Sequence, residues 1–167
     1  MSQTKENLES AFAGESQANR RYLFFAEKAT EEGHRQTARL FRAAAEAETI
    51  HARNHLQVLQ GIKSTKENLL TAIGGENHEF TEMYPGFIKQ AEAEGEKKAR
   101  HSFDMANKVE RIHHGLFQAA LSMLEKGQTV EDKPFYVCQY CGNTVEGEAP
   151  EKCPVCGAPK KMFKQID

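Results

Sequence analysis

Four long stretches of the chain repeat apolar residues at three- and four-residue steps, the spacing of one face of an α-helix. This pattern predicts helices over about 5–31, 34–60, 65–93 and 95–126, and Gly33 and Gly61 are placed to end the first two. A polar stretch follows at 127–133, and the helical pattern does not return after residue 134. We therefore expect an all-α four-helix bundle over residues 1–130 and a separate small domain over 134–167, joined by the linker 127–133.

The apolar faces of these helices also carry carboxylates, which is unusual because a buried charge is costly unless it is paired or binds a metal. Glu48 and His51 lie three residues apart, as do Glu110 and His113, so each pair shares one face of its helix. Glu15 stands 33 residues before Glu48, and a further glutamate, Glu79, stands 31 residues before Glu110. The first two helices therefore read as a repeat of the last two. Four such helices can gather four carboxylates and two imidazoles around two metal ions, as in ferritin-like bundles.

The third predicted helix contains a proline in its middle. Pro85 removes one backbone hydrogen bond and clashes with the carbonyl of Thr81, at a cost of roughly 3 kcal/mol. Either the helix is kinked beside Glu82, which would make room for a movable ligand, or Tyr84-Pro85-Gly86 simply separates two helices.

All four cysteines lie near the end of the chain, in two Cys-x-x-Cys pairs: Cys138 with Cys141, and Cys153 with Cys156. The chain opens without the pattern of an export signal, so this arrangement favours metal binding over disulfides and a cytoplasmic location. A domain of about 34 residues buries little core, so the metal must hold it together. Four thiolates accept zinc and iron equally well on geometry alone.

Composition narrows the range of partners. The net charge of −2 gives no electrostatic reason to expect nucleic acid or an anionic membrane surface. No apolar run approaches the length of a membrane span, so no membrane partner is expected.

Taken together, these residues give a resemblance to rubrerythrin over essentially the whole chain. The motifs that carry it are Ala13-Gly14-Glu15-Ser16, Ala47-Glu48-x-x-His51-Ala52-x-Asn54-His55, Glu79-x-x-Glu82-Met83-Tyr84-Pro85, Glu110-x-x-His113 and the two cysteine pairs. The resemblance implies a ferritin-like di-iron bundle followed by a rubredoxin-like domain. It implies these ligands for two irons: Glu15, Glu48, Glu79, Glu82, Glu110 and His113.

The same resemblance implies a mechanism and a set of partners. His51 would exchange with Glu82 at one iron as the oxidation state changes, and Tyr22 would donate a hydrogen bond near the site. Cys138, Cys141, Cys153 and Cys156 would hold a single iron, which zinc can replace in recombinant protein. The implied activity is reduction of hydrogen peroxide to water in oxidative-stress defence, with electrons relayed through the four-cysteine iron from rubredoxin or its reductase.

Two other functions fit parts of the sequence. A ferroxidase could use the same bundle with dioxygen, although it would not need the attached electron-transfer domain. Alternatively, the four cysteines could form a zinc ribbon for partner binding beside a purely structural bundle.

The connection between the second and third helices is short. Residues 61–65 reach at most roughly 17 Å, whereas the second helix is about 40 Å long. The chain therefore cannot make the crossover that runs the length of a ferritin bundle. Either the helices form a simple up-down bundle, or helices 1–2 of one chain pair with helices 3–4 of another in a domain-swapped homodimer, which we favour.

Overall fold

The computed structural model describes residues 2–128 and 132–166 and divides into two compact units, Met1–Lys63 and Ser64–Asp167. Part of the predicted linker 127–133 lies outside the described residues, so the domain boundaries at 130 and 134 stay predictions. The fold class is confirmed: the long segments are helical, and a small sheet with a four-cysteine knuckle follows them.

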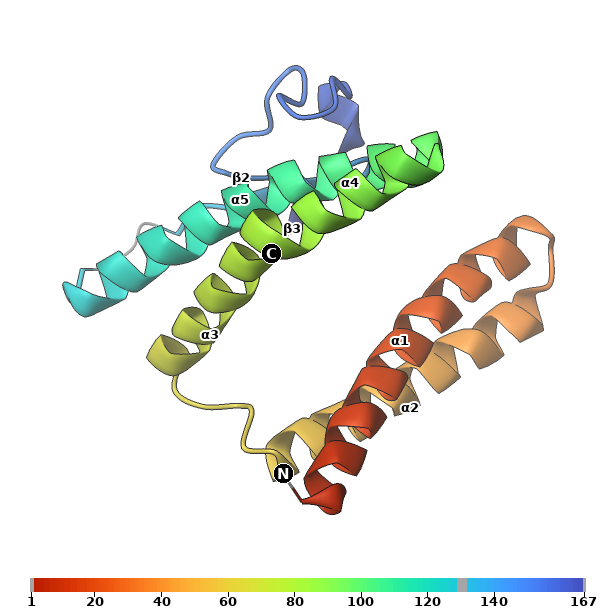
Figure 1. Ribbon diagram of the computed structural model, residues 1–167. Coiled ribbons are helices and arrows are strands. Elements are labelled where there is room, and N and C mark those ends of the chain that lie inside the picture. Colours follow the sequence, from red (N-terminus) through yellow and green to blue (C-terminus); the bar gives the residue numbers. More distant parts are fainter. Residues whose placement is uncertain (1, 129–131, 167) are drawn as a thin grey trace. The chain divides into compact units, whose positions relative to one another are not determined.

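The first unit is a hairpin of two antiparallel helices, α1 (Gln3–Glu31) and α2 (Arg35–Val58), as Figure 1 shows. Gly33 makes the turn with φ of 82°, a left-handed conformation that favours glycine. Asn19 on α1 donates one amide proton to the Ala45 carbonyl at 2.7 Å and another to the Thr49 hydroxyl at 2.9 Å, both on α2. The residues buried in this unit share a small side chain, which lets the two helices approach closely: Ala26, Ala29, Ala38 and Ala45.

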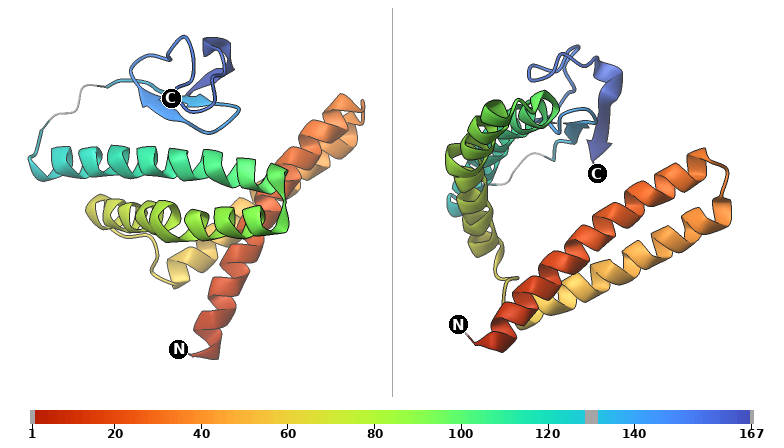
Figure 2. Two further views of the ribbon diagram at one scale, coloured as in Figure 1. Left: turned by 45° about the horizontal axis from the view of Figure 1, so that its top comes forward. Right: turned by 45° about the vertical axis from the view of Figure 1, so that its right-hand side comes forward.

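The second unit begins with α3 (Thr65–His78), which Ser64 and Glu67 start with a reciprocal capping box. A π-helical turn, η1 (Glu79–Met83), follows directly, and α4 (Tyr84–Glu94) continues from it. Gly95 ends α4 with φ of 73°, and α5 (Lys97–Glu125) returns beside both α3 and α4 (Figure 2).

The predicted helix over 65–93 is therefore neither uniformly α-helical nor split at Pro85. Pro85 stands in the first turn of α4, and the residue before it, Tyr84, donates its backbone N–H to the Glu79 carbonyl five residues back. A π turn of this kind admits one extra residue into a helix and is frequent at functional sites. The extra residue gives the proline a place without breaking the helix.

The four-cysteine module contains three short antiparallel strands: β1 (Phe135–Cys138), β2 (Thr144–Glu146) and β3 (Phe163–Ile166). Their order is β2-β1-β3, with Val137 opposite Thr144 on one side and opposite Lys164 on the other. A 3-10 turn, Lys160–Met162, leads into β3. The module also packs on α5, and the contact is formed by β2.

Several large apolar side chains remain exposed on the helical hairpins. On α2, Leu40 and Val58 are each 67% exposed. They lie five helical turns apart on one line along the helix, and His51 lies between them close to the same line. The face that carries His51 is therefore apolar and uncovered within its own unit. No helix in the described part of the chain is long and apolar enough to cross a membrane.

Candidate metal centres

The hairpin of α1 and α2 brings three predicted ligands together. One possible ligand atom from each of Glu15, Glu48 and His51 lies within 4.8 Å of the others. Nδ1 of His51 is 2.8 Å from Oε2 of Glu48, one helical turn before it. The Glu48 side chain is 17% exposed, whereas that of His51 is 54% exposed, so this half-site opens on the uncovered face of α2.

The second unit holds an equivalent group, made by Glu76, Glu110 and His113 within the same 4.8 Å limit. Nδ1 of His113 is 2.8 Å from Oε2 of Glu110, as in the first half-site. Here the histidine is better covered, with 27% of its side chain exposed. Its hydrogen bond with Glu110 raises the pKa of His113 despite burial of the ring.

Glu76 is the most perturbed carboxylate of this group. Burial, followed by the hydrogen bond and the negative charge of Glu110, raises its pKa from 4.5 to about 7. Its Oε2 atom is buried and has no hydrogen-bond partner among the described residues. Two carboxylates forced together with an unsatisfied oxygen are the arrangement that a bound cation would relieve, so these residues fit a metal.

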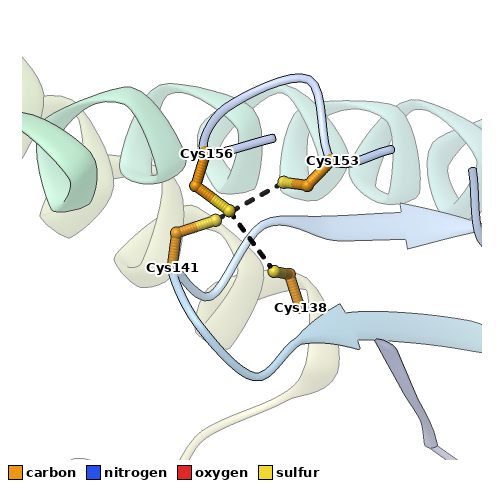
Figure 3. A group of neighbouring side chains, drawn as sticks. All are labelled: Cys138, Cys141, Cys153 and Cys156. Carbon is orange, nitrogen blue, oxygen red and sulfur yellow. Dashed lines mark hydrogen bonds between the residues drawn. The ribbon is translucent and has the colours of Figure 1, made fainter. Parts of the chain in front are cut away.

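The four cysteine thiols converge in the C-terminal module (Figure 3). Cys138 Sγ is 3.7 Å from Cys156 Sγ, and Cys141 Sγ is 3.5 Å from Cys153 Sγ. These separations are too long for a disulfide and close to the roughly 3.8 Å edge of a tetrahedron with metal–sulfur bonds of about 2.3 Å. The module is therefore shaped for one tetrahedral metal ion.

Both knuckles have the same backbone geometry. The N–H of Gly142 donates to the Cys138 carbonyl, and the N–H of Gly157 donates to the Cys153 carbonyl, each at 2.8 Å. Their φ angles of 83° and 77° explain why glycine follows the second cysteine of each pair.

Backbone N–H groups and burial also change the pKa values of the thiols. Burial works against ionisation of Cys153, but the N–H groups of Cys156 and Val155, together with the thiols of Cys141 and Cys156, outweigh it and lower its pKa to about 7. Burial raises the pKa of Cys141 and Cys156 in the absence of metal. A metal must therefore supply the charge that keeps all four sulfurs ionised.

Comparison with known proteins agrees with this geometry. The family model described as Rubrerythrin matches residues 6–121, and the one described as Rubrerythrin, rubredoxin-like domain, matches residues 136–164. The chain belongs to the rubrerythrin family. Members of this family carry a di-iron bundle and a rubredoxin-like iron site, and both donor sets are present in this rubrerythrin. Membership makes the protein an oxidoreductase at the level of its family.

Curated relatives match over nearly their full length. Rubrerythrin-2 of Clostridium acetobutylicum is 37% identical, with 96% of this chain and 95% of the relative covered. Rubrerythrin of Porphyromonas gingivalis is 38% identical, with 99% and 90% covered. A solved structure of nigerythrin in its mixed-valence state has a TM-score of 0.59 at 36% identity, covering 99% of this chain and 88% of that one.

The structure differs from the sequence-based prediction on the third helix. Glu82 does not join the ligand group: its side chain is 73% exposed, and one of its oxygens lies 3.4 Å from Nδ1 of His78. Glu79 is half-buried near the group, and burial together with the negative charge of Glu110 raises its pKa. The position that completes the second half-site is Glu76, three residues earlier than the predicted Glu79.

A sequence signal for Glu76 was present. Gly14-Glu15 and Gly75-Glu76 are matching dipeptides, and Glu76 precedes Glu110 by 34 residues, against 33 for Glu15 and Glu48. The one-residue excess is what the π turn η1 adds to this half of the repeat. An alignment that assumed uninterrupted α-helices could not allow for it.

Two tyrosines occupy corresponding places in the repeat, seven residues after Glu15 and eight after Glu76. Tyr22 packs against Phe25 and Phe41, with ring centroids 6.4 and 6.1 Å away. Tyr84, which the sequence analysis did not select, is half-buried, and burial together with the charge of Glu110 raises its pKa. The second tyrosine is therefore directly under the influence of the metal-binding carboxylates.

Proposed function

We propose that this rubrerythrin is a non-haem di-iron peroxidase that reduces hydrogen peroxide to water, with electrons relayed through the four-cysteine iron. The observation that carries the proposal is the direct contact between the two kinds of site: Nε2 of His113 lies 2.9 Å from the hydroxyl of Thr144 in the four-cysteine module. A bundle that only stored or oxidised iron would not need an electron-transfer module against one of its ligands.

We assign the di-iron ligands from the two half-sites, with Glu79 added and Glu82 left out. The proposed set is Glu15, Glu48, His51, Glu76, Glu79, Glu110 and His113 for the two irons, and Cys138, Cys141, Cys153 and Cys156 for the single iron. When bound, two ferrous ions would supply the two electrons that cleave the peroxide bond. Five carboxylates suit hard iron better than they suit soft metals.

Two observations support iron rather than zinc. A nigerythrin that is 36% identical has been solved in a fully reduced, all-ferrous state. The four-thiolate site of this chain is joined to the redox bundle rather than standing alone. The expected readout is the red colour of iron–thiolate in protein from its native source, since zinc–thiolate is colourless.

Glu79, rather than Glu82, is the residue that we propose to exchange with His51. Glu79 begins the π turn, where the regular α-helical hydrogen bonds are interrupted, and it is half-buried. A carboxylate there can shift with less loss of backbone order than one inside a regular helix. Burial and the charge of Glu110 raise the pKa of Tyr84 further above its ordinary 10, and its protonated hydroxyl can donate a hydrogen bond toward the carboxylates.

We also propose that the functional form is a homodimer with exchanged helix pairs. The connector between Val58 and Thr65 has six residues and spans roughly 24 Å when fully extended. α2 has 24 residues and is about 36 Å long. The apolar face of α2 that carries His51 is exposed, and a helix pair from a second copy can bury it without a long crossover.

Complementation tests this arrangement. One chain would carry Glu15→Ala and Glu48→Ala, the other Glu76→Ala and Glu110→Ala, and the two would be unfolded and refolded together. In an exchanged heterodimer one bundle has both intact halves, so statistical mixing should restore about a quarter of the wild-type di-iron content. If each chain forms its own bundle, every bundle has a defective half and the mixture stays empty.

The activity is tested by stopped-flow oxidation of the fully reduced protein with hydrogen peroxide and, separately, with dioxygen. A peroxidase reacts much faster with peroxide, and a reduced external rubredoxin then sustains turnover. Faster oxidation by dioxygen would instead identify a ferroxidase and overturn the proposal. Cytoplasmic location and the identity of the electron donor stay predictions.

A further inference from the structure

The loop after the first cysteine knuckle touches α5 at two consecutive turns. A Cβ added to Gly142 would lie 3.8 Å from Cγ1 of Val109, and Thr144 reaches His113, four residues further along α5. Val109 is only 2% exposed and Asn143, between the two contacts, only 1%. The contact is therefore a packed surface and not a single surface hydrogen bond.

The hydrogen bonds of Thr144 place a proton on Nε2 of His113. The Thr144 hydroxyl donates to the Gly142 carbonyl at 3.1 Å. A hydroxyl has one proton, so at 2.9 Å from Nε2 of His113 it must act as an acceptor. Nε2 then bears a proton, and the ring meets Glu110 and Glu76 through Nδ1.

This arrangement matters for metal binding. A histidine can ligate only through a nitrogen that carries no proton, and the hydrogen bond made by its other nitrogen selects the tautomer. In the metal-free chain Nδ1 also carries a proton, which it donates to Glu110 at 2.8 Å; a metal ion would displace that proton, while the acceptor at Thr144 keeps the one on Nε2. The first half-site has no corresponding partner for Nε2 of His51 among the described residues, and that ring is 54% exposed.

We propose that Thr144 is a positioning residue for the di-iron site: its hydroxyl accepts from Nε2 of His113, which leaves Nδ1 as the nitrogen that a metal can take, and it ties this ligand to the four-cysteine module. The proposal rests on the proposed function, in which His113 is an iron ligand. The four-cysteine module then has a structural role at the di-iron site in addition to electron transfer. The two half-sites are then unequal, because one histidine is held from outside the helices and the other is not.

The test uses full-length protein whose four-cysteine site already holds iron, titrated with Fe(II) without oxygen. Thr144→Val removes the hydroxyl but keeps the branched shape, and Thr144→Ser keeps the hydroxyl. Thr71→Val is the matched control, because Thr71 is exposed and its hydroxyl bonds to the Glu67 carbonyl of its own helix, at 3.0 Å. An unchanged iron–thiolate spectrum verifies that the module is folded in each variant.

We expect Thr144→Val to weaken Fe(II) binding at one of the two sites by about 10-fold, the effect of losing a hydrogen bond behind a metal-ligating histidine. Thr144→Ser and Thr71→Val should bind as the unaltered protein does. In zinc-loaded protein, nuclear magnetic resonance should detect a slowly exchanging Nε2 proton on His113, lost in Thr144→Val and retained in Thr144→Ser.

Equal affinity in all variants, or an Nε2 proton that is equally protected in Thr144→Val, would overturn the inference while leaving the proposed function intact. If the unaltered protein bound no Fe(II) outside the four-cysteine site, the proposed function would fail and this inference with it.

Discussion

Glu76→Gln should make the metal-free protein more stable at neutral and alkaline pH while destroying its metal site. Glu76 has a pKa of about 7 in the folded chain, against its ordinary 4.5. Below pH 4.5 the carboxyl is protonated in both folded and unfolded chains. Between pH 4.5 and 7 only the unfolded chain ionises it, so stability is lost as pH rises through this window.

The size of the effect follows from the shift. A difference of 2.5 pH units between 4.5 and 7, at 1.36 kcal/mol per unit, gives a loss of about 3 kcal/mol. The Glu76 side chain is only 19% exposed, so solvent screens little of it. Glutamine has the same shape, carries no charge and can still donate to Glu110. The variant should therefore avoid most of this loss at pH 8.

The assay is chemical unfolding of metal-free bundle in the full-length chain, with the four-cysteine site filled, at pH 5 and pH 8. Iron content is measured in parallel. Glu82→Gln is the control, because the Glu82 side chain is 73% exposed and should affect neither property. The reasoning is refuted if Glu76→Gln loads two irons normally, or if Glu82→Gln is the variant that loses them.

Three further changes have defined outcomes. Cys138→Ser should remove the iron–thiolate absorption and stop donor-driven turnover, while a chemically reduced bundle still consumes one equivalent of peroxide; continued turnover with the external donor would contradict the relay. Gly142→Ala should destabilise the four-cysteine module by about 1–2 kcal/mol, because φ of 83° is strained for any side chain; faster loss of iron to a chelator would show it, and unchanged retention would count against it. His51→Ala should leave irons bound but slow peroxide reduction, and unaltered single-turnover kinetics would exclude its exchange with Glu79.

The helices and the cysteine module could be predicted from the sequence because their signals are local. Apolar spacing located the helices to within a few residues, and the capping residues Ser64 and Gly95 lie where the chain changes direction. The cysteine pairs fix their own geometry, since two Cys-x-x-Cys knuckles leave little freedom to four sulfurs. The Glu-x-x-His pairs were equally clear, and in both the histidine Nδ1 lies 2.8 Å from the glutamate one turn before it.

The solitary ligand of the third helix could not be placed by the same reasoning. Choosing among Glu76, Glu79 and Glu82 depends on the phase of the helix, and η1 changes that phase between the first and last of them. Nothing in apolar spacing reports a π turn, although Pro85 marks its end. The role of Thr144 was hidden for a different reason, since it arises from contact between residues 31 positions apart.

The π turn has a further consequence for what this chain tolerates. Each residue of an α-helix turns its successors by about 100°. The wider π turn absorbs one extra residue, so deleting one residue within 79–83 should restore a regular α-helix and leave Phe87, which packs on Phe103 at 5.5 Å, beside α5. The segment should therefore accept the loss of one residue better than the regular turns of α3 and α4, where the same deletion would rotate every later side chain away from α5.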